Sequence, residues 1–259
     1  MSPPTGLLID LGGVVYQAGA AIPGSIDAIA RLKTHGVSLR FLTNTTSKPV
    51  RELLEQLRSY GLGLDRSEVF TPAMAARAYI EHHKIQPHYL MRDTLLEDFE
   101  GVATGDQPAV VLADAGEKFS FDSLNDAFRR IEAGALLVAL AANRKFVDDD
   151  GKLSLDTGAF VAALEYATEC EAIVLGKPSA DFFRMAVADL GLEPQQVAMI
   201  GDDAEFDVCA AMRAGLSGYL VRTGKWQPDA TENLTPQPTD VFDDLSSVAD
   251  WIVGDNAGP

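Results

Sequence analysis

Four apolar runs in the sequence end in polar residues whose types are suited to binding a metal ion and a phosphate. The four groups are Asp10 followed by Gly12-Gly13, Thr43-Asn44 after Phe41-Leu42, Lys177 in Gly176-Lys-Pro-Ser179, and Gly201-Asp202-Asp203 with Asp207 five residues beyond Asp202. In a parallel sheet, ligands bind at the carboxyl ends of the strands. If these runs are neighbouring strands, the carboxylates, the lysine and the hydroxyl converge on one site.

Clustered carboxylates repel one another, so a bound cation is the natural compensation. Oxygen ligands without His or Cys favour Mg²⁺, which commonly joins one or two carboxylates to a substrate phosphate. A lysine and a hydroxyl match the remaining phosphoryl oxygens, and a carboxylate that attacks phosphorus gives an aspartyl-phosphate. Taken singly, each group has a simpler explanation: Asp10 and Thr43-Asn44 as turn or helix caps, Lys177 as a solvated loop residue. Their joint occurrence at four strand ends favours a functional site.

The elements that must position these groups follow from the alternation of short apolar runs and amphipathic stretches, which is typical of a parallel α/β sheet. Strands are expected at 6–10, 37–42, 88–91, 109–113, 136–141, 172–175, 196–200 and 218–221. Helices are expected from Pro23, at 48–60, 73–83, 122–133 and 158–168, from Ser179, and at 204–214 and 245–253. The run 148–151 is typical of a hairpin turn between two short strands. A calcium loop is the alternative there, but its later ligands are missing.

The composition limits the partners. The chain has 259 residues and a net charge of -17, which argues against binding nucleic acid or an anionic membrane. No apolar run approaches the ~20 residues of a membrane span, and the first residues lack the basic region of a signal peptide. Cys170 and Cys209 lie in apolar, helix-like stretches and are expected to be buried, reduced thiols. We therefore expect a cytoplasmic protein.

With these residues in view, the sequence resembles the haloacid dehalogenase superfamily of aspartyl-phosphate hydrolases in all four of its motifs. The resemblance implies that Asp10 is the nucleophile, Thr43 and Asn44 bind the phosphoryl group, and Lys177 steadies the phosphate and the nucleophile. It also implies that Mg²⁺ is held by Asp10, the Gly12 main chain and Asp202, with support from Asp203 and Asp207.

The resemblance further implies an α/β fold: a Rossmann-like parallel sheet core formed by residues 1–72 and 174–259, with an inserted, smaller α/β cap domain of the C2 type at 73–173. The chain is most similar to the subfamily of phospholysine phosphohistidine inorganic pyrophosphate phosphatase and its haloacid-dehalogenase-like relatives. Stretches that carry this likeness are Val111–Glu117, Ala163–Ala167, Gly176–Phe183 and Val221–Lys225. Cap loops near Asp114, at Asn143-Arg144-Lys145 and at 156–158 are implied to face the substrate, so Asn143 and Arg144 are candidate substrate-binding residues. Since similar caps often mediate dimerisation, a homodimer is a further expectation.

One position departs from the superfamily pattern. Most of its phosphatases carry a second Asp two residues after the nucleophile, as general acid and base, and this sequence has Gly12 there. Glycine cannot deliver a proton, and such help contributes about 10²–10⁴-fold in rate. Three explanations stay open: a leaving group that needs little protonation, a proton from water or the cap, or loss of turnover with retained metal and phosphate binding.

The function that these observations predict is Mg²⁺-dependent hydrolysis of a small phosphorylated compound, pyrophosphate or a phosphoramidate. Two alternatives remain. One is a phosphate- and metal-binding protein with little or no turnover, because of Gly12. The other is a haloacid dehalogenase with the same nucleophile, which is disfavoured because cleaving carbon–halogen bonds has no use for the acids at Asp202, Asp203 and Asp207.

Overall fold

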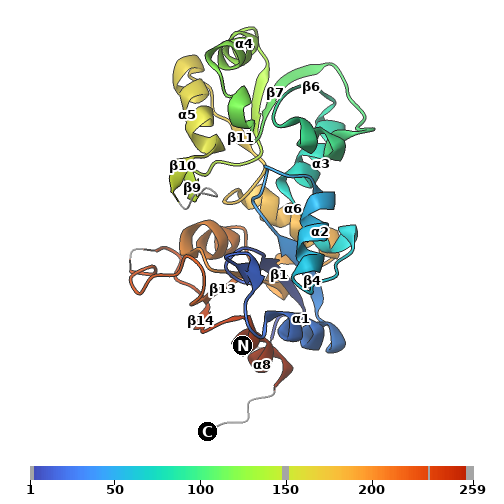
Figure 1. Cartoon of the computed structure of the whole chain (residues 1–259), viewed down its shortest axis with the longest axis vertical. Coiled ribbons are helices and arrows are strands. Elements are labelled where there is room, and N and C mark those ends of the chain that lie inside the picture. Colours follow the sequence, from blue (N-terminus) through green and yellow to red (C-terminus); the bar gives the residue numbers. More distant parts are fainter. Residues whose placement is uncertain (1–2, 148–151, 233, 255–259) are drawn as a thin grey trace. The chain divides into compact units, whose positions relative to one another are not determined.

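The computed structural model describes residues 3–147, 152–232 and 234–254, and it confirms the α/β class (Figure 1). The chain divides into two compact units. Unit 1 comprises Met1–Thr43, Leu54–Phe70 and Pro178–Pro259, and unit 2 comprises Asn44–Leu53 and Thr71–Lys177. The predicted domain boundaries at 72/73 and 173/174 stay a prediction.

Unit 1 is built on a six-stranded sheet in the order β14-β13-β12-β1-β4-β5, in which every strand pair is parallel. Its strands are β1 (Gly6–Asp10), β4 (Ser38–Leu42), β5 (Val69–Phe70), β12 (Val197–Gly201), β13 (Ser217–Val221) and β14 (Asp240–Phe242). All residues of β1 and β12 are buried, as expected for strands covered on both faces. The sheet therefore places the ends of β12, β1 and β4 beside one another.

The helices of unit 1 are α1 (Ser25–Thr34), α6 (Ala180–Leu190), the short α7 (Ala210–Arg213) and α8 (Leu245–Val253), while α2 (Val50–Ser59) begins in unit 2 and ends in unit 1. Helix α1 packs against α8, and Arg31 pairs with Asp250 at 2.6 Å. A small antiparallel pair, β2 (Tyr16–Gln17) and β3 (Ala20–Ala21), follows β1.

Unit 2 contains a four-stranded parallel sheet in the order β11-β8-β7-β6. Its strands are β6 (Ile85–Leu90), β7 (Gln107–Leu112), β8 (Leu136–Ala139) and β11 (Ile173–Val174), and its helices are α3 (Pro72–His83), α4 (Phe121–Glu132) and α5 (Thr157–Thr168). Leu90, Val110 and Leu137 of the sheet share one buried cluster with Ile131 of α4 and Leu164 of α5. Strands β9 (Lys145–Val147) and β10 (Leu153–Leu155) pair antiparallel, whereas the predicted turn at 148–151 lies outside the described residues.

Three expectations about the helices and the cysteines differ from the structure. Pro23 precedes the first helix, whose N-cap is Gly24 with a left-handed φ of 80°. The helix expected at 204–214 is divided into a π-helical segment, Ala204–Cys209, and α7. Cys170 follows α5 and is only half-buried, while Cys209 is buried, and both are free thiols. Short 3₁₀ turns at Arg66–Glu68, Asp93–Phe99, Gly116–Lys118 and Pro194–Gln196 complete the elements.

Candidate active site

Three of the predicted site residues lie at one edge of the unit 1 sheet. Asp10 is the last residue of β1, Thr43 follows the last residue of β4, and Asp202 follows the last residue of β12. Because β12, β1 and β4 are adjacent and parallel, their carboxyl ends meet at this edge. The three side chains are nearly buried, with exposed fractions of 7%, 5% and 3%.

Three carboxylates converge there. Oxygen atoms of Asp10, Asp202 and Asp207 all lie within 4.8 Å of one another, and all three residues are buried. We call them the acidic group. Asp207 comes from the helical segment after β12, so the sequence spacing from Asp202 does not by itself show that the two acids meet.

The π-helical segment Ala204–Cys209 brings Asp207 back to the end of β12. The Asp203 carbonyl accepts hydrogen bonds from the amides of Asp207 (3.1 Å) and Val208 (3.3 Å), and the second of these closes a wider i to i+5 turn. A Cβ atom on Gly201 would overlap the Asp207 side chain, with Oδ2 only 2.5 Å away. Glycine at 201 therefore lets this carboxylate lie against the strand end.

The Asp202 carboxylate lies so close to the main chain of Gly13 and Gly224 that only glycine fits at these two positions. A Cβ atom on Gly13 (φ 80°) or on Gly224 (φ 59°) would overlap the Asp202 carboxylate. The amide of Lys225 donates to Asp202 Oδ2 at 2.7 Å, and Thr223 Oγ1 donates to the Gly13 carbonyl at 2.5 Å. The loop after β13 and the loop after β1 thus fix the carboxylate from two sides.

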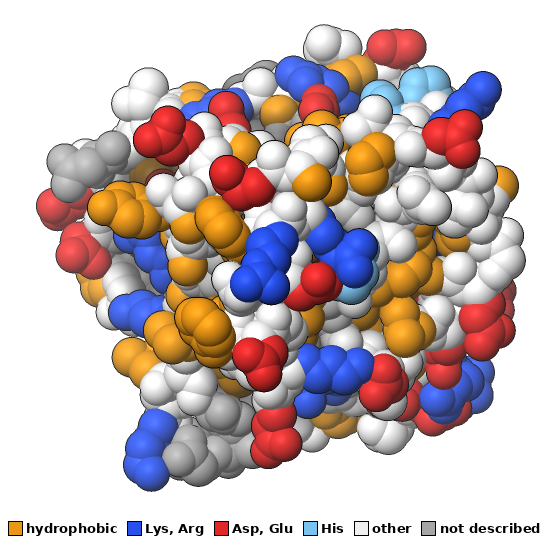
Figure 2. All heavy atoms as spheres, turned by 90° about the horizontal axis from the view of Figure 1, so that it is seen from above, with side chains coloured by type: hydrophobic (Ala, Val, Ile, Leu, Met, Phe, Trp, Pro, Cys, Tyr) orange, Lys and Arg blue, Asp and Glu red, His pale blue; other side chains and the backbone are white. Residues whose placement is uncertain are grey.

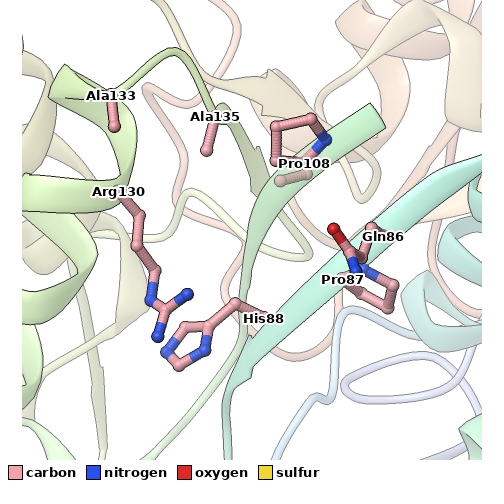
Figure 3. Close-up of a pocket in the computed structure, with 8 residues that line it drawn as sticks. Gln86, Pro87, His88, Pro108, Arg130, Ala133 and Ala135 are labelled. Atoms are coloured by element: carbon pink, nitrogen blue, oxygen red, sulfur yellow. The ribbon is translucent and has the colours of Figure 1, made fainter. Parts of the chain in front are cut away.

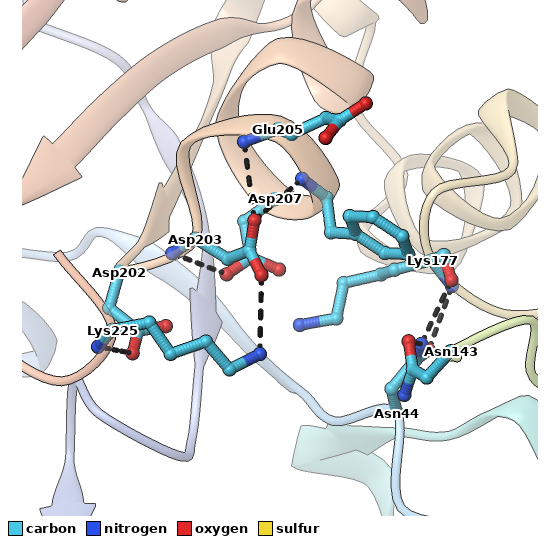
Figure 4. Close-up of polar contacts among 9 residues, drawn as sticks. Asn44, Asn143, Lys177, Asp202, Asp203, Glu205, Asp207 and Lys225 are labelled. Atoms are coloured by element: carbon cyan, nitrogen blue, oxygen red, sulfur yellow. Dashed lines mark hydrogen bonds and ion pairs between the residues drawn. The ribbon is translucent and has the colours of Figure 1, made fainter. Parts of the chain in front are cut away.

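Asp203, predicted to support the metal, lies at the N-cap of the π-helical segment. Its carboxylate accepts from the amides of Glu205 (3.2 Å) and Phe206 (2.9 Å) and pairs with Lys225 Nζ at 3.2 Å (Figure 4). Desolvation lowers the pKa of Lys225, but the carboxylates of Asp203, Asp207 and Asp202 raise it by more, so the pKa lies above its ordinary value. Lys225 is a charged group of the site that the sequence did not single out, because it lies four residues beyond the end of β13.

The charges of the acidic group fit a divalent cation. Two like charges at 4.8 Å repel by about 3.5 kcal/mol at an effective dielectric constant of about 20, and burial weakens the solvent screening. All donors are carboxylate oxygens, the ligands that Mg²⁺ prefers. Asp10, Asp202 and Asp207 would hold such an ion, which would neutralise charge on a bound phosphate.

Gly12 lies two residues beyond Asp10, is half-buried, and forms a bridge to Tyr16. Nothing lies within 4 Å of a Cβ atom built on it, and its φ is outside the left-handed region. The position therefore has room for a side chain. Its predicted contribution, a main-chain carbonyl ligand to the metal, stays a prediction.

The remaining predicted residues belong to unit 2. Lys177 is 5% exposed. Asn44 contacts both the Lys177 main chain and the Asn143 side chain (Figure 4). Arg144 is exposed, and its carbonyl accepts the amide of Asp156 at 3.2 Å. The structure thus groups Asn44, Asn143 and Lys177, and no described contact adds the Arg144 side chain to them.

Unit 2 also carries a pocket of about 380 Å³, lined by Gln86, Pro87, His88, Pro108, Ala109, Arg130, Ala133 and Ala135 (Figure 3). It lies at the amino ends of β6 and β7, whereas Asn143 follows β8 at the carboxyl end of the sheet. Asp126 pairs with both His88 (3.2 Å) and Arg130 (2.8 Å). Figure 2 views the molecule from the α4 end, where basic and acidic side chains are interspersed.

Comparison with known proteins identifies the class. Residues 7–103 match the family model of haloacid dehalogenase-like hydrolases, and residues 174–248 match a second model of the same kind. The chain is 41% identical over 247 residues to haloacid dehalogenase-like hydrolase domain-containing protein 2 of Rattus norvegicus, covering 95% of each protein. The chain therefore belongs to the haloacid dehalogenase-like hydrolases, as its motifs predicted.

One further relative and two solved structures are also similar to the chain. The chain is 39% identical over 254 residues to phospholysine phosphohistidine inorganic pyrophosphate phosphatase of Danio rerio, covering 96% of this chain and 94% of that protein. The solved structure of p-nitrophenyl phosphatase from Archaeoglobus fulgidus superposes with a TM-score of 0.88 at 27% identity, covering 96% and 99% of the two chains. A glycerol phosphate phosphatase from Mycobacterium tuberculosis, solved in complex with magnesium, superposes with a TM-score of 0.83 at 26% identity, covering 95% of this chain and 76% of that one. Among the described residues, no helix is long and apolar enough to span a bilayer.

Proposed function

We propose that this protein is a Mg²⁺-dependent phosphohydrolase that works through an aspartyl-phosphate on Asp10. The observation that carries the proposal is the buried acidic group of Asp10, Asp202 and Asp207, whose oxygens lie within 4.8 Å of one another. Phosphatase names among the relatives and the magnesium complex of one structural neighbour support it.

The chemistry proceeds in two steps. One Asp10 carboxylate oxygen attacks phosphorus in line, so a bond from aspartate oxygen to phosphorus forms while the bond to the leaving group breaks. Water then attacks the aspartyl-phosphate, which releases inorganic phosphate and restores the Asp10 carboxylate. A bound Mg²⁺ would neutralise charge on the phosphoryl oxygens. By the motif assignment, Thr43, Asn44 and Lys177 bind the phosphoryl group and Asn143 and Arg144 contact the rest of the substrate.

Gly12 narrows the substrate class. Without an acid at this position, the enzyme favours substrates whose leaving group departs with little protonation. We therefore propose pyrophosphate or a phosphoramidate as the substrate class, in line with the name of the Danio rerio relative. A cytoplasmic location and a homodimer stay predictions of the sequence.

The test is a phosphate-release screen over pyrophosphate, phosphoramidates and p-nitrophenyl phosphate, with a halide-release assay on a haloacid beside it, each with Mg²⁺ and with EDTA. The matched variants are Asp10→Asn, which keeps the size of the side chain, and Asp229→Asn, which makes the same charge change at an exposed position. We expect activity that needs both Mg²⁺ and Asp10 and is unchanged in Asp229→Asn. Metal-independent halide release would instead favour a dehalogenase, and Mg²⁺ binding without Asp10-dependent turnover would favour the binding protein that Gly12 keeps open.

A further inference from the structure

The side chain of Asn44 forms two hydrogen bonds with the main chain of one residue, Lys177. Its Oδ1 accepts the amide of Lys177 at 2.8 Å, and its Nδ2 donates to the Lys177 carbonyl at 2.8 Å (Figure 4). A peptide amide can only donate and a carbonyl can only accept, so these two bonds fix which atom of Asn44 is oxygen and which is nitrogen. The second proton of Nδ2 is then directed to Asn143 Oδ1 at 3.3 Å.

Neighbouring residues are fitted to this contact. A Cβ atom on Gly176 would lie 2.8 Å from Asn44 Oδ1 and would overlap the Leu140 carbonyl, so a side chain at 176 would push Asn44 away. Pro178 follows Lys177 and restricts its main chain to extended conformations. Gly176, Pro178 and the Asn44 side-chain amide thus together fix the position of the Lys177 main chain.

Asn143 is itself held through its main chain. Its carbonyl accepts the amide of Gly158 at 2.9 Å, and a Cβ atom on Gly158 would lie 2.6 Å from the same oxygen. Gly158 is in the first turn of α5, so Asn143 connects the end of β8 and the start of α5 to Asn44.

We propose that Asn44 and Asn143 are positioning residues for Lys177 and that neither uses its side-chain amide to bind substrate. In this arrangement Asn143 orients Asn44, and Asn44 fixes the Lys177 main chain from which the ammonium group extends. The inference rests on the proposed function, since it assigns the pair to the lysine that binds the phosphoryl group. It keeps the proposed roles of Asp10 and Lys177 and replaces the motif assignment of Asn44 and Asn143 as substrate contacts.

Two substitutions at Asn143 separate the two roles. Asn143→Asp keeps an oxygen that accepts from Asn44 Nδ2, whereas Asn143→Ala removes it. For a positioning residue we expect kcat/KM for pyrophosphate within about threefold of wild type in Asn143→Asp and about tenfold lower in Asn143→Ala. For a substrate contact the order is reversed, because a carboxylate repels the phosphate. Asn143→Asp being worse than Asn143→Ala overturns the proposal.

A second measurement does not depend on turnover. Exchange of the Lys177 amide proton, followed by NMR, should be at least about tenfold faster in Asn44→Ala, because its acceptor is lost. Asn125→Ala, a half-buried asparagine of α4, is the matched control and should leave this exchange unchanged. Exchange at the wild-type rate in folded Asn44→Ala contradicts the proposal. If this variant does not fold, the comparison of kcat/KM between Asn143→Asp and Asn143→Ala decides between the two roles.

The failure of the proposed function is distinguishable from the failure of this inference. If wild type shows no Asp10-dependent phosphate release, the proposed function fails, while amide exchange at Lys177 still tests the contact. If wild type hydrolyses the substrate and Asn143→Asp has a lower kcat/KM than Asn143→Ala, the proposed function is supported and the positioning role is wrong.

Discussion

The acidic group should make the metal-free protein less stable than its packing allows, and Asp207→Asn should relieve this. The substitution removes two of the three repulsive carboxylate pairs within 4.8 Å. At an effective dielectric constant of about 20, two such pairs at 4.8 Å repel by roughly 7 kcal/mol. Loss of the attraction to Lys225 reduces the gain. We therefore expect Asp207→Asn to raise the free energy of unfolding in EDTA by about 1–3 kcal/mol.

Urea unfolding at pH 7.5 and constant ionic strength measures this, once in EDTA and once in saturating Mg²⁺. Asp229→Asn carries the same change in net charge at an exposed position and is the control. In Mg²⁺ the variant's advantage should shrink, because wild type gains about 2.7 kcal/mol at 100 times the dissociation constant and the variant binds the ion more weakly. If Asp207→Asn is no more stable than Asp229→Asn in EDTA, the carboxylates are compensated within the protein and the reasoning fails.

Three further outcomes follow from the same structure. Gly12→Asp should fold normally, because the position has open space, and in phosphate-release assays it should raise the rate of alkyl phosphate hydrolysis at least about tenfold while leaving the rate of pyrophosphate hydrolysis nearly unchanged. An unchanged rate on the alkyl phosphate would show that protonation of the leaving group is not rate-limiting. Gly13→Ala should abolish stabilisation by Mg²⁺ in thermal unfolding, whereas Gly36→Ala, with a similar φ of 77° and open space, should cost only about 1–2 kcal/mol. Desolvation and then the charge of Arg130 lower the pKa of His88, so His88 stabilises the folded state above pH 6.5 and this stabilisation is lost as the pH falls. Arg130→Gln should raise the NMR titration midpoint of His88, and a lower midpoint would contradict this role of Arg130.

The edge of the sheet that carries Asp10, Thr43 and Asp202 could be predicted from sequence because each residue directly follows a short apolar run. Alternation of strands and helices makes these runs parallel, and parallel strands place their ends together. Strands β5 and β14 were missed, since two or three residues at a sheet edge carry no periodicity. Their pairing is decided by tertiary contacts.

The contacts of individual acids and amides could not be predicted in this way. The meeting of Asp207 with the acidic group depends on a π-helical segment, and helical periodicity in the sequence does not distinguish a π-helical turn from an α-helical one. Asn44 follows Thr43 in a motif, but its partners are main-chain atoms of Lys177, which every residue has. A contact to main-chain atoms does not depend on the partner's amino-acid type, so the sequence does not reveal it.

Glycine stands at positions 12 and 13 for different physical reasons, and the difference bears on the reaction. Gly13 is required by shape, because any side chain there would overlap the Asp202 carboxylate and its φ is left-handed. Gly12 is not required by shape, since a Cβ atom there would meet nothing within 4 Å. The missing acid at position 12 therefore cannot be attributed to lack of room. Of the three explanations for Gly12, the one that we propose is a leaving group that departs from phosphorus without a proton from this position.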